Sequence, residues 1–547
     1  MTRNPRRDLL AGLTVAVVAL PLALGFGVSS GLGAEAGLAT AVVAGALAAL
    51  FGGSHLQVSG PTGAMTVVLL PIVAAHGPGG VLTVGLMAGV LLIALAFLGA
   101  GRFMRYLPAP VVEGFTLGIA CVIALQQVPN ALGVPKPEGD KVLPVTWHAV
   151  QAFVRAPNWT ALLLALAVAV VMLVGARLRP AVPFSVVAVA AATLTVQLLH
   201  LDAAAPIGTL PSGLPAPSLA FLEPAALPSL LAPAVAVAAL AALESLLSAT
   251  VADGMTTGHR HDPDRELFGQ GIANLAAPLF GGVPATAAIA RTAVNVRTGA
   301  GSRLAALTHA LVLAVIVFAA APLVSRIPLA ALAGVLLATA VRMVEVGALR
   351  AMARATRPDA VVLVLTAAAT LVLDLVYAVI IGLAVAGALA LRAVARQTRM
   401  ERTEVTADLT GPHSPEEHAL LAEHIAAYRI EGPLFFAGAP RLLPELSEVA
   451  GVRVVVLRMA GITTMDATGA LALKDAVRTL HRRGIAVFAA GIRPGHLPVL
   501  ASVGALGLLQ SEGQAHATTG EAVTAARAHL HRSGLLPAAP VTEEAVR

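Results

Sequence analysis

Long apolar segments, separated by charged residues, Gly/Pro clusters or polar turns, occupy the chain as far as residue 396. Their length and composition predict α-helices that cross a membrane. We count fourteen, at residues 9–29, 36–51, 61–75, 80–100, 109–128, 158–175, 181–200, 233–252, 267–280, 284–297, 304–325, 328–344, 359–374 and 376–396. The third and the tenth are shorter than the roughly 20 residues that a full crossing needs. We expect both to be half-helices whose leading chain is buried in protein.

A repeated motif precedes both half-helices. The stretch LFGGSHLQVSGPTGA begins at Leu50 and the stretch LFGGVPATAAIARTAVN begins at Leu279, and each has a proline and a threonine after LFGG. Matching half-helices in the two halves of a chain indicate inverted repeats, here of seven plus seven segments, whose helix N-termini face each other near the membrane midplane. Pro61 and Pro284 suit the first helical turn, because proline lacks an N–H that would be unpaired there.

The composition supports an α-helical polytopic membrane domain over residues 1–402. The chain is 57% hydrophobic and 12% charged, with a mean hydropathy of +0.84. So little polar surface cannot cover a water-soluble core. The single cysteine, Cys121, lies in an apolar segment, which excludes a disulfide framework and a cysteine-based metal site. We expect no metal and no cofactor.

The basic residues predict the orientation of the chain in the membrane. With the N-terminus inside, the inner loops hold nineteen arginines, whereas the outer loops hold four basic residues, Lys136, Lys141, Arg155 and Arg326. This bias matches the positive-inside rule. We therefore expect a multi-pass protein of the cytoplasmic membrane with both termini in the cytoplasm. The bias also accounts for the net charge of +6 without a nucleic-acid partner.

A soluble α/β domain is expected over residues 403–535, followed by a flexible tail over 536–547. The apolar stretch from Val452 to Met459 predicts a buried strand, an amphipathic helix follows, and the stretch from Ile485 to Ile492 predicts a second strand. Strand, helix and strand in this order are typical of a parallel βαβ unit. The last helix is expected from Gly520 to Arg532.

The facing half-helices predict an anion-binding site. Each helix N-terminus carries about half a positive charge and free N–H groups. Hydroxyl groups can add donors, small residues let a ligand approach the backbone, and an arginine two turns into the second half-helix adds a full charge within the membrane. The candidate substrate-binding residues are Gln57, Ser59, Thr62, Gly63, Thr286, Ala287, Ala288 and Arg291.

Glu244 is the candidate proton-coupling residue. It lies in the apolar eighth segment with Ser248 one turn later. A carboxyl group at this depth favours its protonated form unless it is paired. The alternative is a static ion pair with Arg291. Glu35, at the outer edge of the second segment, could help to admit protons.

Four long stretches resemble the sulfate permease (SulP) anion transporters. They begin at Ala11 (AGLTVAVVALPLALGFGVSSGLGAEAGL), Phe51 (FGGSHLQVSGPTGAMTVV), Val251 (VADGMTTGHRHDPDRELFGQGIAN) and Gly281 (GGVPATAAIARTAVN). The resemblance implies that segments one to four and eight to eleven form a core domain that moves against a gate domain, in a homodimer. It also implies anion binding at Thr62, Gly63, Ala287 and Arg291. The resemblance further implies that sodium-driven bicarbonate members carry an aspartate in the eighth segment and a hydroxyl residue one turn later, where this chain has Glu244 and Ser248. Ala288 stands where a hydroxyl residue is frequent. These departures disfavour sodium coupling, and family members with a glutamate at this place favour proton coupling.

The soluble domain resembles a STAS domain, the module usual at the C-terminus of this family. Related bacterial switch domains carry a phosphorylatable serine directly after an aspartate, but here Ala467 follows Asp466. Thr468 is a weaker acceptor that can instead help Asp466 to cap the helix. Phosphorylation at this position is therefore disfavoured. A cytoplasmic regulator that docks on this domain is still compatible with the sequence.

Three functional classes fit these observations. They are a proton-coupled anion symporter, an uncoupled exchanger or channel, and a membrane-tethered signalling module. The sequence contains no nucleophile with a base and no phosphate loop, so an enzyme is not expected. Sulfate, bicarbonate and dicarboxylates such as fumarate all suit two helix N-termini and an arginine. A buried glutamate with few hydroxyl groups favours a proton-driven, fumarate-like dicarboxylate.

Overall fold

The protein divides into two compact units, Met1–Ala386 and Gly387–Arg547. The computed structural model describes residues 4–106, 108–137, 139, 141–179, 182–201, 205–208, 213–256, 260–373, 375–403, 415–439, 451–510 and 514–536. The first unit is helical, and the second combines a sheet with helices. The predicted fold class, a helical membrane protein with an α/β domain after it, is confirmed.

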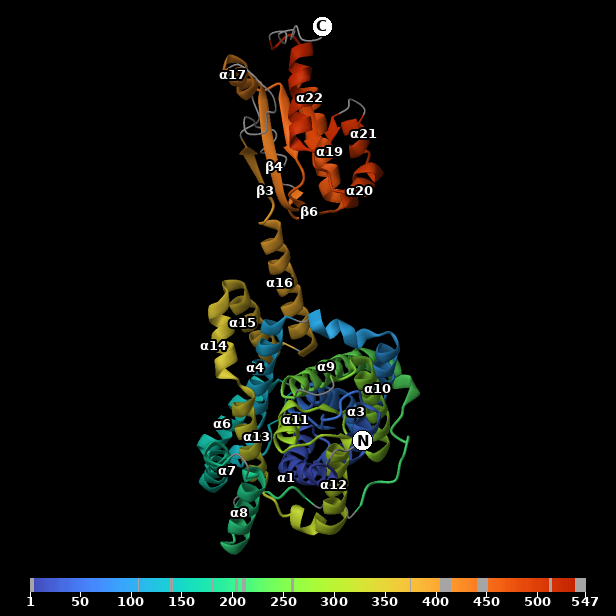
Figure 1. Cartoon of the computed structure of the whole chain (residues 1–547). Helices are drawn as coiled ribbons and strands as arrows, with labels where there is room; N and C mark the ends of the chain where they lie inside the picture. The colour runs from blue at the N-terminus through green and yellow to red at the C-terminus, as the bar shows by residue number, and fades with distance from the viewer. Residues whose placement is uncertain are drawn as a thin grey trace. The chain divides into compact units, whose positions relative to one another are not determined.

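The helices as far as residue 395 are drawn in Figure 1, and the last of them, α16, continues past the end of the first unit. They are α1 (Pro5–Ser29), α2 (Ala34–Phe51), α3 (Gly63–Phe97), α4 (Ala109–Gln126), α5 (Val128–Leu132), α6 (Val142–Arg155), α7 (Trp159–Leu178), α8 (Phe184–Leu198), α9 (Leu227–Gly254), α10 (Pro263–Ala276), α11 (Ile289–Arg297), α12 (Arg303–Val324), α13 (Leu329–Met343), α14 (Val346–Ala355), α15 (Arg357–Val372) and α16 (Leu375–Ala395), with short 3-10 turns η1 (Ala100–Tyr106), η2 (Pro224–Ala226) and η3 (Ala277–Phe280).

Each predicted apolar segment coincides with a helix, and the third and fourth share α3. This helix is interrupted at Gly77, whose φ of 67° and ψ of −175° leave the helical region. The first part of α3 therefore ends near Gly77, and its being a half-helix within the membrane stays a prediction. Among the residues described, nine helices are long and apolar enough to cross a membrane by themselves. The count of fourteen crossings stays a prediction.

The helices pack in two groups that match the expected division into core and gate. The core group consists of α1, α2, α3, α9, α10, α11 and α12, which pack on one another. The gate group consists of α4 to α8, α13 and α15. In Figure 1 the core helices α1, α3, α9, α10, α11 and α12 gather in one group, while α4, α7 and α13 stand beside them. The two groups meet where α1 contacts α8 and α13 and where α3 contacts α4.

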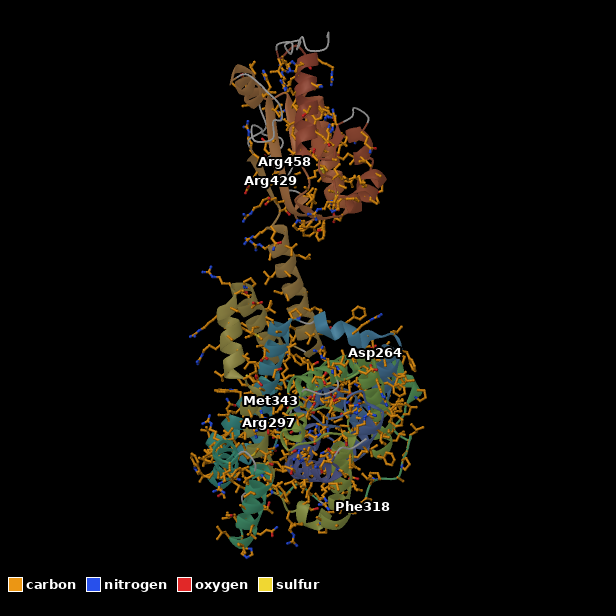
Figure 2. All side chains as sticks on the ribbon, viewed as in Figure 1. Asp264, Arg297, Phe318, Met343, Arg429 and Arg458 are labelled. Carbon is orange, nitrogen blue, oxygen red and sulfur yellow. The ribbon has the colours of Figure 1, made fainter. Side chains whose placement is uncertain are left out.

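The outer surface of the first unit is apolar. Phe318 of α12 (Figure 2) is 57% exposed, and further exposed leucine, valine and phenylalanine side chains lie along most of these helices. A soluble protein would not expose so many large apolar side chains. A lipid bilayer provides the surroundings that such a surface requires.

The second unit is built around a sheet with the strand order β3-β4-β5-β7-β8, and β6 pairs with β4. Its elements are β3 (Arg399–Thr403), α17 (Pro415–His424), β4 (Ile425–Leu434), β5 (Val454–Arg458), β6 (Ile462–Met465), α19 (Ala467–Arg482), β7 (Ala486–Ala490), η6 (Pro494–His496), α20 (Leu497–Ser502), α21 (Ala505–Gln510), β8 (Ala515–His516) and α22 (Thr519–Arg532). Strands β5 and β7 are parallel, which confirms the expected βαβ unit.

Both faces of this sheet are covered. Alternate residues of β5 point to opposite sides, so Val455 packs with α19, α20 and α21, whereas Val454 packs with α17 and α22. Asp466 caps α19 by accepting a hydrogen bond of 2.7 Å from the N–H of Gly469. Thr468 lies inside the helix, so the aspartate alone provides the side-chain cap.

Within the core group, α3 and α10 approach through two glycines. A Cβ on Gly89 would lie 2.8 Å from the carbonyl oxygen of Gly271, and a Cβ on Gly271 would lie 2.9 Å from that of Gly89. Such contacts let two backbones pack closely. Because α10 supports the site described below, this contact determines where the site lies.

We expect Gly89→Leu to destabilise the first unit, because the added side chain must push α3 away from α10. Overpacking of this kind costs about 1–3 kcal/mol. Thermal unfolding in detergent, followed by size-exclusion chromatography, measures the loss. Gly347→Leu is the matched control, since no atom lies within 4 Å of the position of its Cβ. Equal melting temperatures for the two variants would contradict the prediction.

Candidate anion-binding site

Two short strands pair within the core group, and we call the place where they pair the crossing. Strand β1 (Ser59–Gly60) precedes α3, strand β2 (Thr286–Ala287) precedes α11, and the two pair antiparallel. The N–H of Ala288 extends the pairing with a bond of 3.1 Å to the carbonyl of Val58. The expectation for the prolines is therefore wrong. Pro61 lies before the N-cap of α3, and Pro284 lies before β2, because the extended pairing occupies the residues that we assigned to helix.

Both helices begin at this crossing with free backbone donors. The N–H groups of Gly63 and Ala64 in α3, and of Ile289 and Ala290 in α11, have no acceptor among the residues that the structure describes. Ile289 is 38% exposed, so the start of α11 is accessible. Unpaired N–H groups and the positive ends of two helix dipoles are suited to an anion.

Thr62 and Glu244 link α3 to α9 beside these donors. The Oγ1 of Thr62 accepts a hydrogen bond of 3.3 Å from the N–H of Met65, and so caps α3. The same hydroxyl donates to Oε2 of Glu244 at 2.8 Å. Glu244 is half-buried, whereas Thr62 is buried. A carboxyl group is therefore held at the positive end of α3, where an anion would also be attracted.

Buried hydroxyl groups of α9 fix the second strand and α11. The Oγ atoms of Ser245 and Thr286 lie 2.9 Å apart, and Ser248 donates to Oγ1 of Thr292 at 3.0 Å. Thr292 also accepts a bond of 3.1 Å from the N–H of Val58. Ser248 thus supports α11 and makes no hydrogen bond to Glu244 in the part of the chain that is described.

Arg291 is buried and reaches across the crossing. It is 1% exposed, and its Nη2 donates to the carbonyl oxygen of Pro61 at 2.8 Å. Arg291 lies in the first turn of α11 and not two turns in, because β2 delays the start of the helix to Ile289. No ion pair joins it to Glu244 in the described part of the chain, although the two charges interact at longer range. A guanidinium without a carboxylate partner leaves a positive charge available.

Side-chain amides hold the extended segments in place. Gln57 donates to the carbonyl of Ser245 at 3.1 Å, and Gln270 of α10 donates to Ser59 at 2.7 Å. Asn274, one turn after Gln270, both donates to and accepts from the backbone of Ala285 at 2.8 Å. Gln270 and Asn274 were not among our candidates. The sequence did offer a signal for them, since two side-chain amides lie one helical turn apart shortly before the second LFGG.

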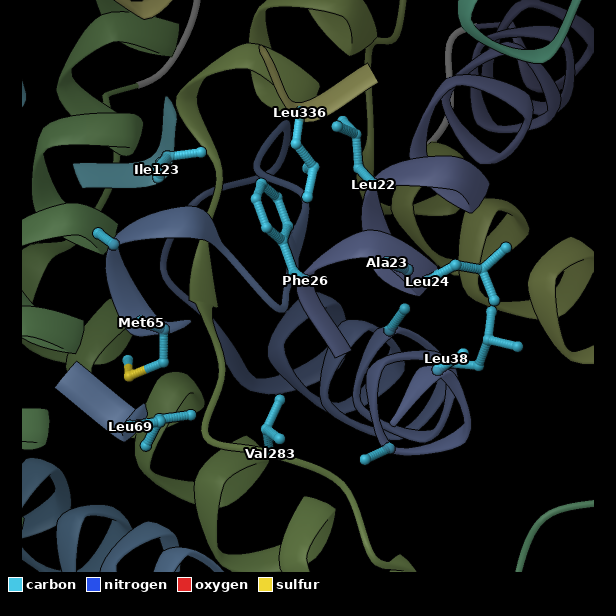
Figure 3. Close-up of a cluster of buried hydrophobic side chains, with 14 of the residues drawn as sticks. Leu22, Ala23, Leu24, Phe26, Leu38, Met65, Leu69, Ile123, Val283 and Leu336 are labelled. Atoms are coloured by element: carbon cyan, nitrogen blue, oxygen red, sulfur yellow. The ribbon is translucent and has the colours of Figure 1, made fainter. Parts of the chain in front are cut away.

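Apolar side chains from both helix groups cover the start of α3. A Cβ on Gly63 would collide with the side chain of Ile123 from α4 and would lie 3.1 Å from the ring of Phe26 from α1. Figure 3 shows Phe26 between Ile123 and Leu336 of α13. Sequence analysis missed Phe26 and Ile123 because they resemble any other apolar residue of a membrane helix.

The predicted residues therefore gather in one place with one exception. Gln57, Ser59, Thr62, Gly63, Glu244, Ser248, Thr286, Ala287, Ala288 and Arg291 all lie at or beside the crossing. Glu35 lies near the start of α2 and lines a separate pocket with Leu214 and Ile316. Ten residues of helix, about 15 Å, separate it from Gly45, which faces Ser59.

We expect Thr292→Val to destabilise the crossing, because valine keeps the shape but removes the acceptor for two buried donors. A buried donor without an acceptor costs about 1–3 kcal/mol. A lower melting temperature in detergent and weaker anion binding are the expected readouts. The control is Thr298→Val, an exposed residue at the end of the same helix. If both variants behave alike, Thr292 does not have this supporting role.

Comparisons with known proteins agree with this arrangement. A model of the sulfate permease family matches residues 6–366, and a model of the STAS domain matches residues 420–522. A putative sulfate transporter of Bacillus subtilis is 35% identical over 498 residues, which cover 89% of this chain and 92% of the relative. A bicarbonate transporter of Picosynechococcus is 31% identical, over 87% of this chain and 86% of the relative.

Solved structures show the same fold. The transmembrane domain of a cyanobacterial bicarbonate transporter is 34% identical, with a TM-score of 0.62 over 71% of this chain and 98% of that chain. Murine solute carrier 26 family member A9, an anion transporter solved in an inward-facing state, is 17% identical, with a TM-score of 0.82 over 96% of this chain and 92% of that chain. The facing half-helices, the crossing strands and these matches lead to one conclusion: the chain belongs to the sulfate permease family, a family of membrane transporters, and carries a STAS domain.

Proposed function

We propose that this protein is a secondary active transporter that carries small anions across the cytoplasmic membrane and binds them between the N-termini of α3 and α11. The observation that carries the proposal is a set of four N–H groups, next to the buried charge of Arg291, that have no acceptor among the described residues; they belong to Gly63, Ala64, Ile289 and Ala290. An anion placed there satisfies donors that the protein leaves open. Its charge is also balanced by an arginine that no carboxylate pairs within the described residues.

The bond between Thr62 and Glu244 supports proton coupling. A carboxylate at the end of α3 occupies a position that attracts anions, so its negative charge opposes the binding of a second negative group. Protonation of Glu244 removes this repulsion. By linkage, a bound anion then favours the proton on Glu244 to the same extent. Glu244 is half-buried, so part of its side chain is accessible from outside the protein. Glu35, away from the crossing, remains a candidate for admitting protons.

Transport requires the site to open alternately to the two sides of the membrane. Ile123 belongs to the gate group and contacts the position of Gly63 in the core group, so a movement between the groups uncovers or covers the start of α3. We propose a homodimer with both termini in the cytoplasm. The distribution of basic residues supports this orientation. A cytoplasmic regulator that docks on the STAS domain is the corresponding proposal for residues 403–535.

A dicarboxylate of the fumarate type is the substrate that we favour, because a protonatable glutamate beside few accessible hydroxyl groups suits a carboxylate carried with a proton. Sulfate and bicarbonate form the second candidate class, supported by the names of the relatives. Uptake of labelled fumarate, sulfate and bicarbonate into proteoliposomes, with and without pH and sodium gradients, separates these possibilities. A channel or uncoupled exchanger would show no accumulation coupled to the proton or sodium gradient.

We expect Glu244→Gln to abolish accumulation driven by an inward proton gradient, while downhill exchange continues. Glutamine can still accept the bond from Thr62 but cannot carry the proton. Uptake in proteoliposomes at fixed outside pH and varied inside pH measures the effect. Glu223→Gln, an exposed residue outside the helices, is the control. A Glu244→Gln protein whose uptake still follows the proton gradient would rule out this coupling residue.

We expect Arg291→Ala to weaken anion binding roughly tenfold to a hundredfold, the range for losing a hydrogen-bonded charge. Isothermal titration in detergent with fumarate, sulfate and bicarbonate in turn measures the dissociation constants. Arg297→Ala, exposed at the far end of α11 (Figure 2), removes an equal charge away from the crossing. Unchanged affinity in Arg291→Ala, or an equal loss in Arg297→Ala, would count against the site.

A further inference from the structure

His309 of α12 is a buried polar residue that the proposed mechanism does not use. Its exposed fraction is 0%. Neither Nδ1 nor Nε2 has a hydrogen-bond partner among the described residues. An imidazole always has at least one N–H donor and, when neutral, one acceptor. Two open positions on one buried ring are rare in proteins and call for a physical explanation.

Arg291 has a matching open position. Its Nη2 is bonded to Pro61, but its Nη1 is fully buried and has no partner in the described part of the chain. Nη1 of Arg291 lies against Gly60, which packs on Ala41 of α2, and Nδ1 of His309 lies beside Gly45, one turn further along α2. One donor of the guanidinium and the acceptor of the imidazole are therefore both unpaired in the same region.

Two glycines border these groups. A Cβ on Gly60 would lie 2.7 Å from Nη1 of Arg291. A Cβ on Gly45 would lie 3.9 Å from Nδ1 of His309 and 3.3 Å from the carbonyl oxygen of Ser59. The region behind β1, next to Gly45 and Gly60, is thus bordered by Nη1 of Arg291, the imidazole of His309 and the carbonyl oxygen of Ser59. Such a set of partners suits a buried water, which typically makes about three hydrogen bonds.

We propose that His309 is a positioning residue for Arg291, with its neutral imidazole joined to Nη1 through a buried water behind β1. The guanidinium is then fixed at two points: Nη2 is held by the carbonyl oxygen of Pro61, and Nη1 is held by the water bound to His309. Its planar group can no longer rotate about the end of the side chain, so its charge stays aimed at the start of α11. A charged imidazole would instead repel Arg291. This inference rests on the proposed role of Arg291 in anion binding.

A comparison of His309→Leu with His309→Gln tests the role of the imidazole. Leucine removes both hydrogen-bonding positions, and we expect the KM for anion uptake to rise about fivefold, the effect of one lost hydrogen bond, with little change in maximal rate. Glutamine keeps a donor and an acceptor and should restore most of the affinity. Labelled fumarate, sulfate and bicarbonate are used as parallel probes. The control is Leu313→Val, equally buried one turn later on α12.

Repeating the substitution in an Arg291→Lys protein gives the decisive measurement. Lysine has no second terminal nitrogen to hold, so His309→Leu should produce no further rise in KM there. Additive effects, equal losses in His309→Leu and His309→Gln, or a wild-type KM in His309→Leu would each overturn the inference. If Arg291→Lys itself binds all three anions with wild-type affinity, the proposed anion site fails first, and the role of His309 fails with it.

Discussion

The whole arrangement depends on one constraint, which is that backbone groups leaving a helix inside a membrane must find partners within the protein. The chain meets this requirement by pairing β1 with β2, so each interrupted segment satisfies the other. The pairing places two helix beginnings side by side. The proposed binding site therefore follows from the need to pair backbone groups. The side chains only adjust the positive potential that the two helix N-termini already create.

Polar side chains also serve as hydrogen-bond partners for backbone groups at the edges of the core group. Asn274 serves both backbone groups of Ala285, and Glu266 accepts from the N–H groups of Gly53 and Ser54 at 2.9 and 3.0 Å. Asp8, in the first half of the chain, accepts a hydrogen bond of 2.7 Å from the N–H of Gly301 in the second half. The bonds of Glu266 and Asp8 connect a helix of one half to a loop of the other half, whereas Asn274 holds a loop of its own half. Together they tie the core group into a single body, as the proposed movement against the gate group requires.

The sequence predicted the location of the site better than its local geometry. The LFGG repeats and the short apolar segments identified both half-helices, and Glu244 stood out as a carboxyl group in an apolar helix. The depth of Arg291 was misjudged because two-residue strands carry no hydrophobic period that distinguishes them from a helical turn. Ile123 could not be found in the same way, because its importance comes from contact with Gly63 across two helices.

In the proposed transport cycle, the two charged groups at the crossing also determine how the membrane potential would act on the core group. With the site empty, Arg291 and an ionised Glu244 sum to zero. With a monovalent anion bound and a proton on Glu244, the sum is again zero, so neither form is driven by the potential. A divalent anion carried with the same proton leaves one negative charge, and each 100 mV then changes the energy of a full crossing by about 2.3 kcal/mol. An inside-negative potential would thus select the singly charged form of the substrate.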